Sequence, residues 1–441
     1  MSLQPPEKTR KLQETLHAKA KGSPDYRFYL LYDKVYREDV LTFAYRCCKA
    51  NDGTAGVDEQ TFEDIETDGV ERWLAELAEA LRMRTYRPQA VRRVYIEKLD
   101  GTKRPLGIPT IRDRVVQMAV VLVLTPIFEA DLSPEQYAYR PGRNALDAVR
   151  KVHSLLNTGY TEVVDADLSA YFDSIPHAEL MKSVARRISD RHVLHLIKMW
   201  LEAPVEGLDD RGRPHRTTRN KDEGRGTPQG APISPLLANL YMRRFVLGWK
   251  KLGHEQRFQA RIVNYADDFV ICCRGSAEDA RRAMQALMER LGLTVNEAKT
   301  RVCHVPDESF DFLGYTIGLC HSTQTGKAYI GTRPSRKRVT RVCGAIHEIT
   351  SPRWRMLDAQ DRVVRLNRLL RGWANYFCLG PVSKAYRAID AHARYRLRRW
   401  LCRKHKVQGQ GITRFPDDYL YRTLGLVRLG PRTHNLPWAK A

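Results

Sequence analysis

The sequence predicts an α+β fold organised around one sheet of short strands. A stretch at 262–273 places two apolar, β-branched-rich runs on either side of a short turn, which is typical of a hairpin. A second strand-like stretch lies upstream at 161–168, and helical spacing follows it over 176–188. After the hairpin, Ser276 can cap a helix over 276–291, and 293–305 returns toward the sheet. Strand, helix, strand, strand, helix, strand is the order of a split β-α-β fold.

The segments before this core are predicted in order along the chain. Residues 1–25 are mostly polar and are expected to form a frayed start, whereas 28–44 reads as a helix. Residues 91–108 read as two strands around a turn at Leu99–Thr102, and their Lys and Arg residues predict one cationic face of the hairpin. An ordinary Lys-rich exposed face is the alternative. The apolar run 115–128 is shorter than the roughly 20 residues that a membrane span requires, so it reads as a buried helix.

The remaining elements lie after the first acidic strand. Residues 205–226 are polar and charged, and we expect a surface insertion there. The next loop, Thr227–Gly230, leads to Ser234, a good N-cap, and then to an apolar helix through Trp249. A last helical pattern covers 362–377, and its aromatic residues are expected to belong to the core: Trp373, Tyr376 and Phe377.

Both predicted strand regions carry acids that an apolar core does not accommodate. Asp165 and Asp167 interrupt the first strand, and Asp267 and Asp268 lie between the two runs of the hairpin. Taken alone, the Asp pair is equally well explained by a turn. Carboxylates brought together from separate strands repel one another unless cations lie between them, and Mg²⁺ prefers such ligands. Because two Mg²⁺ ions can activate a 3′-hydroxyl and stabilise a leaving pyrophosphate, the acids predict a nucleotidyl transferase centred on Asp167, Asp267 and Asp268.

The residues around these acids resemble the motifs of reverse transcriptases. Tyr265-Ala266-Asp267-Asp268 is similar to their signature, and Asp167 with Phe172 is similar to their other metal-binding motif. Several further segments resemble successive blocks of group II intron reverse transcriptases and their maturase domain: 92–98, 104–109, 139–143, 227–235, 296–299, 312–314 and 371–377. On these motifs the chain is identified as a bacterial-type group II intron reverse transcriptase and maturase. It ends at Ala441 without the Cys-rich HNH endonuclease pattern of many relatives, so second-strand cleavage of target DNA is not expected of it.

The resemblance implies a right-hand polymerase in which the split β-α-β sheet is the palm. The expected division is a polar extension at 1–25, fingers at 26–155, a palm with inserted finger elements at 156–325, and a helical, basic thumb and maturase domain at 334–441. The implied reaction is RNA-templated DNA synthesis, in which a primer 3′-hydroxyl attacks the α-phosphate of a dNTP held by two Mg²⁺ ions, with Mn²⁺ as an expected substitute. The implied metal ligands are Asp167, Leu168, Asp267 and Asp268.

The family also implies residues that hold the incoming nucleotide. Arg92 and Lys98 would hold the triphosphate, because both the Arg fork and the Lys point charge suit phosphate. Phe172 would lie under the sugar and clash with a 2′-hydroxyl, and Gln229 would contact the nucleotide or the template. Lys299 is either a proton donor to pyrophosphate or a solvated lysine at a strand edge.

Most of the positive charge lies near the C-terminus. The formal net charge is +23 and the pI about 9.7, and residues 334–441 account for +18 of it, which points to a polyanion. Within this region, Arg394–Lys406 interleaves basic residues with aromatic ones, a pattern suited to phosphate contacts and base stacking. A solvated amphipathic helix is the alternative. The nucleic-acid contacts expected along the whole chain are Arg143, Pro228, Gly230, Arg394, Arg398, Arg399, Arg403 and Lys404.

The cysteine content and the motifs also bear on the compartment, the partners and the alternative functions. The nine cysteines contain no Cys-x-x-Cys, which suggests neither zinc nor disulfides and favours a reducing cytoplasm, with nucleoid association when the protein acts on DNA. The expected partners are an RNA template such as a group II intron RNA, a DNA or RNA primer, target DNA and dNTPs, without a membrane. An RNA-dependent RNA polymerase is disfavoured by Ala266 and Phe172. Two alternatives stay open: an RNA-binding splicing maturase with little polymerase activity, and a domesticated relative that acts in defence or repair.

Overall fold

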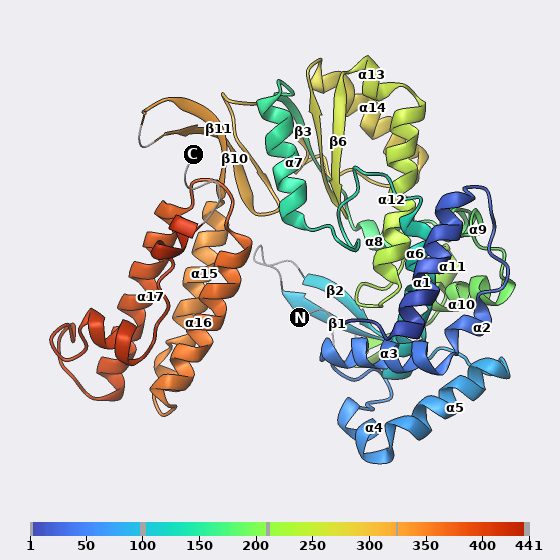
Figure 1. Ribbon diagram of the computed structural model, residues 1–441, viewed down its shortest axis with the longest axis horizontal. Coiled ribbons are helices and arrows are strands. Elements are labelled where there is room, and N and C mark those ends of the chain that lie inside the picture. Colours follow the sequence, from blue (N-terminus) through green and yellow to red (C-terminus); the bar gives the residue numbers. More distant parts are fainter. Residues whose placement is uncertain (1–2, 98–102, 209–211, 323–324, 436–441) are drawn as a thin grey trace.

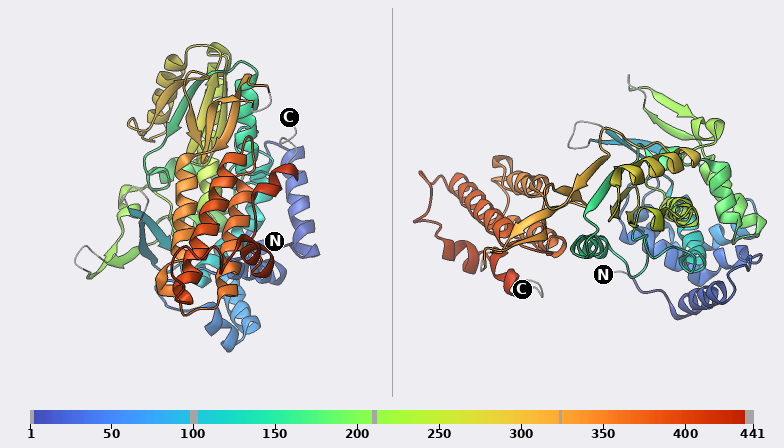
Figure 2. Two further views of the ribbon diagram at one scale, coloured as in Figure 1. Left: turned by 90° about the vertical axis from the view of Figure 1, so that its left-hand side faces the viewer. Right: turned by 90° about the horizontal axis from the view of Figure 1, so that it is seen from above.

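A computed structural model describes residues 3–97, 103–208, 212–322 and 325–435 (Figure 1, Figure 2). Helices and strands are mixed along the chain, which confirms the predicted α+β class. The N-terminal helices and the two four-stranded sheets of the first 304 residues lie on one side of the molecule, and the C-terminal helices stand beside them (Figure 1).

The central sheet has the predicted split β-α-β order. Its four strands lie side by side as β6-β7-β3-β8, and every neighbouring pair is antiparallel. Valine and isoleucine fill this sheet because β-branched side chains pack well on a pleated surface. The strands are β3 (Glu162–Asp167), β6 (Ala260–Tyr265), β7 (Asp268–Cys273) and β8 (Arg301–His304).

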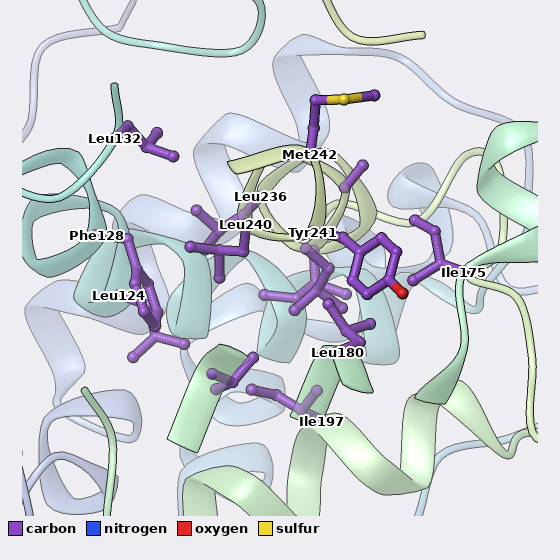
Figure 3. Packing of buried hydrophobic residues seen from close by; sticks show 14 of the residues in the cluster. Leu124, Phe128, Leu132, Ile175, Leu180, Ile197, Leu236, Leu240, Tyr241 and Met242 are labelled. Carbon is purple, nitrogen blue, oxygen red and sulfur yellow. The ribbon is translucent and has the colours of Figure 1, made fainter. Parts of the chain in front are cut away.

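Helices cover both faces of the central sheet. On one face Phe269 and Ile271 join the largest buried cluster, together with α12 and α14. Figure 3 shows part of that cluster, where Leu236, Leu240 and Tyr241 of α12 meet neighbouring helices. The other face is covered by α7, which packs with Val163 of β3 and Val270 of β7. The helices of this half are α6 (Ile111–Glu129), α7 (Ala145–Asn157), α8 (Tyr171–Ser174), α9 (His177–Ala185), α10 (Arg191–Leu201), α11 (Arg219–Glu223), α12 (Ser234–Lys251), α13 (His254–Arg257) and α14 (Ala277–Arg290).

Three helix predictions in this half have clear outcomes. The apolar run 115–128 lies within α6 and is buried, as expected. Ser234 is not the N-cap of α12 but its first helical residue, because its hydroxyl is bonded to the Thr227 hydroxyl at 2.6 Å instead. Ser276 does cap α14, since its side chain accepts a hydrogen bond from the Asp279 amide.

The predicted hairpin at 91–108 forms one half of a second sheet, with β2 at its edge. β1 (Val91–Glu97) and β2 (Lys103–Ile108) pair antiparallel, while the turn predicted at Leu99–Thr102 lies outside the described residues. The polar segment 205–226 adds two further strands, β4 (Val205–Leu208) and β5 (Pro214–Thr217), in the order β2-β1-β4-β5. This insertion therefore extends the hairpin sheet.

The N-terminal segment differs from the expected frayed start. Residues 7–22 form a helix, α1, whose Leu16 and Ala20 are buried in the main cluster, and the Thr9 hydroxyl donates to Asp39 at 2.8 Å. The helix predicted at 28–44 begins only at residue 32 and is divided at Tyr36–Arg37. The helices of this region are α1 (Glu7–Gly22), α2 (Tyr32–Val35), α3 (Glu38–Ala50), α4 (Phe62–Asp68) and α5 (Val70–Arg82).

The C-terminal helices have a core of their own. One buried cluster contains only residues between Val342 and Leu429. A three-stranded sheet connects this region to the palm: β9 (Phe310–Phe312), β10 (Tyr315–His321) and β11 (Ala328–Pro334). The long helices that follow are α15 (Arg336–Ile349), α16 (Ala359–Tyr376) and α17 (Ser383–Lys404).

The aromatic residues at the end of α16 join the two cores. Phe377 is buried against Tyr315 of β10, with ring centroids 5.2 Å apart, while Trp373 and Tyr376 are partly buried beside it. Their prediction as core aromatics is confirmed. Across the described ranges, no helix is long and apolar enough to cross a membrane.

Candidate active site

The predicted acids gather at one end of the central sheet. Asp167 is the last residue of β3 and lies directly opposite Asp268, the first residue of β7. Opposite residues of antiparallel strands point to the same face, and residues two apart on one strand do so as well. The carboxylates of Asp165, Asp167 and Asp268 therefore share a face, and Asp267 lies in the turn next to them.

The turn that carries Asp267 is held in an unusual conformation. Ala266 has a φ of 58°, a region that costs a non-glycine residue roughly 1–2 kcal/mol. Asn264 stabilises it, because its side-chain amide donates to the Ala266 carbonyl at 2.7 Å. Asn264 is fully buried, and its own main chain is bonded to Glu135 and Tyr137. Sequence reasoning gave Asn264 no role, although an amide within an apolar strand was a signal.

The acids raise one another's affinity for protons. The surrounding protein desolvates the Asp268 carboxylate, and Asp267, Asp167 and Asp165 repel it in that order, which raises its pKa to about 7 although solvent reaches the side chain. Arg338, from the first turn of α15, opposes this shift. Burial raises the pKa of Asp165 to about 6, and Arg301, 3.3 Å away, counteracts it. Divalent cations bound among these four carboxylates would supply the positive charge that offsets their repulsion.

A loop between α14 and β8 supports Asp167. The Asn296 amide donates to the Asp167 carbonyl at 2.8 Å, and the Asp167 amide donates to the Thr300 hydroxyl at 3.3 Å. Lys299, on the same loop, places its Nζ 3.7 Å from an Asp167 carboxylate oxygen. The side chain of Leu168 is apolar and buried, so the only metal ligand that this residue could offer is its backbone carbonyl.

The acids form an open arrangement. Within the described parts of the chain, no three His, Cys, Asp or Glu side chains stand together as a metal-binding cluster. Mg²⁺ usually takes only one or two protein carboxylates and completes its shell with water and substrate phosphates. An open group of carboxylates suits that mode of binding.

The cationic residues of the β1–β2 hairpin are divided between its two faces. The strand register places Arg92 and Arg104 on one face and Arg93 and Lys103 on the other, so the expectation of a single cationic face was wrong. The Nε atom of Arg92 is buried and has no hydrogen-bond partner among the described residues, and Arg114 lies near enough to be repelled by it. A guanidinium group with a free Nε suits an anion. Lys98 lies outside the described residues.

The loop Thr227–Gly230 packs directly on β2. The Gly107 amide donates to the Gln229 carbonyl at 2.7 Å, and a Cβ atom at Gly230 would lie 2.7 Å from the Gly107 carbonyl. Gly230 thus permits a close approach to β2. Gly230 is itself exposed, so its contact with nucleic acid stays a prediction. Pro228 is buried against Gly107, so its predicted contact with nucleic acid is corrected, whereas Gln229 stays partly exposed.

Phe172 is bonded through its main chain to the Thr227–Gly230 loop. It is partly buried and packs edge-on against Tyr171, whose hydroxyl donates to the Ala238 carbonyl at 2.6 Å. The Phe172 carbonyl accepts a hydrogen bond from the Thr227 amide at 2.8 Å. These contacts fix the ring on α8, five residues after Asp167.

Tyr139 is a further residue near the acids. Its side chain is 52% exposed, and its φ of 54° is unusual for a bulky residue. Partial burial raises the pKa of its hydroxyl, and the carboxylate of Asp267 is the next largest cause. The segment 139–143 resembles a family block, but the sequence alone assigns no role to Tyr139.

The basic helix α17 divides its arginines between core and surface. Arg398 is buried, with Nε donating to the Phe415 carbonyl at 2.8 Å and Nη2 to Asp417, so its predicted contact with nucleic acid is corrected. Trp400 and Leu401 are buried as well and offer no surface for base stacking. Of the other predicted contacts, Arg403 is exposed, Arg399 is half-buried, Arg394 is paired with Asp417, and Lys404 donates to the Leu357 carbonyl.

Arg143 lies outside α17. It is half-buried, and its Nη1 donates to the Pro134 carbonyl at 2.6 Å. Its guanidinium lies over the Tyr137 ring, 5.2 Å from the centroid. The side chain therefore has a fixed position at the surface.

Comparisons with known proteins agree with this geometry. Residues 96–317 match the family model "Reverse transcriptase (RNA-dependent DNA polymerase)", and residues 339–415 match "Group II intron, maturase-specific domain". Protein YkfC of Escherichia coli (strain K12) is 34% identical over 287 residues, which are 57% of this chain and 73% of YkfC. Group II intron-encoded protein LtrA of Lactococcus lactis subsp. cremoris is 28% identical over 378 residues, 71% of this chain and 61% of LtrA. Nuclear intron maturase 1, mitochondrial, of Arabidopsis thaliana is 32% identical over 290 residues, 47% of this chain and 40% of that protein.

The two matched regions follow the structure. The reverse transcriptase match contains both acid-bearing strands, and the maturase match falls on the C-terminal helices with their separate core. The family implies dependence on divalent metal ions and binding of intron RNA. The chain belongs to the reverse transcriptase family, as an RNA-directed DNA polymerase of the group II intron type joined to a maturase domain.

Proposed function

We propose that this chain copies RNA into DNA at the acid-bearing end of the central sheet, with Mg²⁺ as its metal. One observation carries the proposal: Asp167 and Asp268 face each other across β3 and β7, with Asp267 in the adjoining turn. When bound there, Mg²⁺ would favour the 3′-hydroxylate and neutralise charge on the departing pyrophosphate. Asp167 and Asp267 would hold the ions, aided by the Leu168 carbonyl, and Asp268 would add negative charge to the site.

The chain's own groups would position the incoming dNTP. Arg92 has a buried, unpaired Nε that suits a triphosphate oxygen, and Lys98 is proposed as a second phosphate ligand. Lys299, close to Asp167, would lie beside the departing pyrophosphate, where an ammonium group can donate a proton. Gln229 would contact the nucleotide or the template from the loop that is bonded to β2. Catalysis would then come mainly from positioning and charge neutralisation.

The proposed division of labour follows the expected domains. Residues 26–155 would act as fingers, 156–325 as a palm with inserted finger elements, and 334–441 as a thumb and maturase domain. The separate core between Val342 and Leu429 supports the last boundary. Its exposed cations, such as Arg403, would bind the intron RNA, and Arg143 would contact nucleic acid near the palm. The primer and the target DNA complete the proposed partners.

The enzyme's preference for dNTPs over NTPs tests the proposed DNA synthesis. Primer extension on an RNA template with Mg²⁺ should give DNA from dNTPs and little product from NTPs, because Phe172 would exclude a 2′-hydroxyl. Phe172→Ala should lower that preference by roughly 10- to 100-fold, which is typical of a lost steric contact in a pocket. Phe172→Tyr keeps the ring and should retain the preference.

Two outcomes would contradict the proposal. Equal use of NTPs by the wild type would indicate an RNA polymerase. No product from a wild type that binds RNA tightly would leave an RNA-binding splicing maturase.

A further inference from the structure

A second cationic surface lies on the palm away from the acids. A groove of about 500 Å³ opens between α13 and α14. We call it the α13–α14 groove. The residues that matter for its chemistry are His254, Arg257, Phe258, Asp279, Arg282 and Arg290.

The groove is separate from the polymerase site. α13 leads directly into β6, and the acids lie at the opposite end of that strand. Six residues of a strand span about 20 Å. Figure 1 accordingly shows α13 and α14 at the far end of the central sheet from β1 and β2.

The charge of the groove is positive and only partly neutralised. Asp279, the one acid in its lining, is paired with Arg282. Arg257 and Arg290 form no ion pair in the part of the chain that the structure describes, and Arg257 lies over the Phe258 ring at 5.2 Å. Burial, followed by Arg257, lowers the pKa of His254, so guanidinium groups carry the positive charge at neutral pH.

The spacing of these arginines suits a chain of phosphates. Arg282 and Arg290 lie on one stripe of α14 and are eight residues apart, which is about 12 Å along a helix. A single phosphate cannot reach both, whereas consecutive phosphates of a polymer can. The planar guanidinium fork also matches phosphate oxygens better than an ammonium group does.

We propose that the α13–α14 groove is a second RNA-binding surface, which holds the phosphodiester backbone of RNA outside the polymerase site. The choice of RNA rests on the proposed function, because the chain's net charge of +23 and its maturase match make RNA the polyanion at hand. Bound there, a long RNA would stay attached while another part of it is copied.

The test measures cross-linking of a labelled 30-nucleotide oligo(U) RNA to the segment that contains α13 and α14, because the basic helices at 334–441 would also bind RNA. It uses the full chain, with its polymerase site filled beforehand by an excess of RNA template–DNA primer hybrid. Arg257→Gln with Arg290→Gln should weaken oligo(U) binding about tenfold at low salt, at roughly threefold for each lost phosphate contact. The slope of log affinity against log salt should become shallower by about 1.4, since one single-strand contact contributes about 0.7.

The matched control is Arg72→Gln with Arg281→Gln. It removes the same charge from α5 and from the side of α14 outside the groove, where the two arginines pair with Glu76 and Glu278. Its oligo(U) binding should change less than twofold. Unchanged binding by the groove variant, or equal weakening in the control, would overturn the proposal, as would a preference of the groove for polyglutamate over oligo(U). Primer extension should be normal in both variants, and its absence from the wild type would count against the proposed function and not against the groove.

Discussion

At the scale of single residues, the candidate site is a balance between repelling carboxylates and a few nearby cations. Asp167 has Lys299 at 3.7 Å and Asp165 has Arg301 at 3.3 Å, while Arg338 only partly offsets the charges around Asp268. The protein can keep these acids together because the strand pairs that carry them are buried along their length. Without cations the site therefore reduces the stability of the fold.

Replacing Asp268 by Asn should stabilise the metal-free protein at pH 8. The pKa of Asp268 is raised from 3.8 to about 7, so the folded protein binds this proton more tightly than the unfolded chain does. The stability that this tighter proton binding gives the folded protein is fully present below pH 4. It is lost as the pH rises toward 7, where the Asp268 carboxyl becomes charged. Urea unfolding in EDTA should show a gain for Asp268→Asn at pH 8 and little gain at pH 4. An equal gain at both pH values would show that charge is not the cause.

Arg92 should affect binding of the nucleotide more than the chemical step. Loss of a charge-assisted contact of about 1.5–3 kcal/mol predicts that Arg92→Ala raises the KM for dNTPs roughly 10- to 100-fold. Steady-state primer extension measures this change. Arg93 is the matched control, because it lies next in sequence on the opposite face of β1. A similar KM in the two variants would remove Arg92 from the nucleotide site.

At the scale of elements, two glycines set how closely the β1–β2 hairpin and the Thr227–Gly230 loop approach each other. Gly107 and Gly230 let two main chains approach so closely that no side chain fits between them. This contact places Gln229 beside β2, where the cations of the β1–β2 hairpin also lie. The proposed nucleotide site thus depends on a junction between two elements distant in sequence.

Gly230→Ala should disturb that junction. Its φ is 120°, and the new Cβ would lie 2.7 Å from the Gly107 carbonyl, so a cost of about 1–3 kcal/mol is expected. We expect kcat/KM to fall at least tenfold. Gly344→Ala in α15 is the control, because nothing lies within 4 Å of its Cβ position, and it should stabilise the helix by about 1 kcal/mol with normal activity. Urea unfolding and primer extension report both effects, and normal activity of Gly230→Ala would contradict the account.

The sequence predicted those elements whose patterns are local. The acidic strand and the acid hairpin could be predicted because acids interrupt or separate β-branched runs near residues 167 and 267. The first helix was missed because its polar surface hides Leu16 and Ala20, which are recognisable as buried only once α6 is in place. The partner of Ser234 and the inward position of Arg398 are likewise set by residues far along the chain, Thr227 and Asp417. Contacts of this kind leave no periodic pattern.

At the scale of the whole molecule, the candidate active site and most of the positive charge lie in parts of the chain with separate cores. The acids belong to the central sheet, whereas residues 334–441 carry +18 of the net charge of +23 around a separate core. The ring contacts of Phe377 with Tyr315 join these parts, and Arg338 of α15 reaches the field of Asp268. The packed contact between Phe377 and Tyr315 would therefore hold RNA-binding helices at a fixed position relative to the acids.

The most direct test of the account is primer extension with dNTPs on an RNA template, at fixed salt and with Mg²⁺, by the wild type and by an Asp267→Ala, Asp268→Ala variant. Salt must be fixed because RNA binding by a basic protein depends steeply on it. The account predicts DNA product from the wild type, no detectable product from the double variant, and RNA affinity within about twofold in both, because neither acid should bind phosphate. DNA synthesis that persists in the double variant would contradict the assignment of the active site.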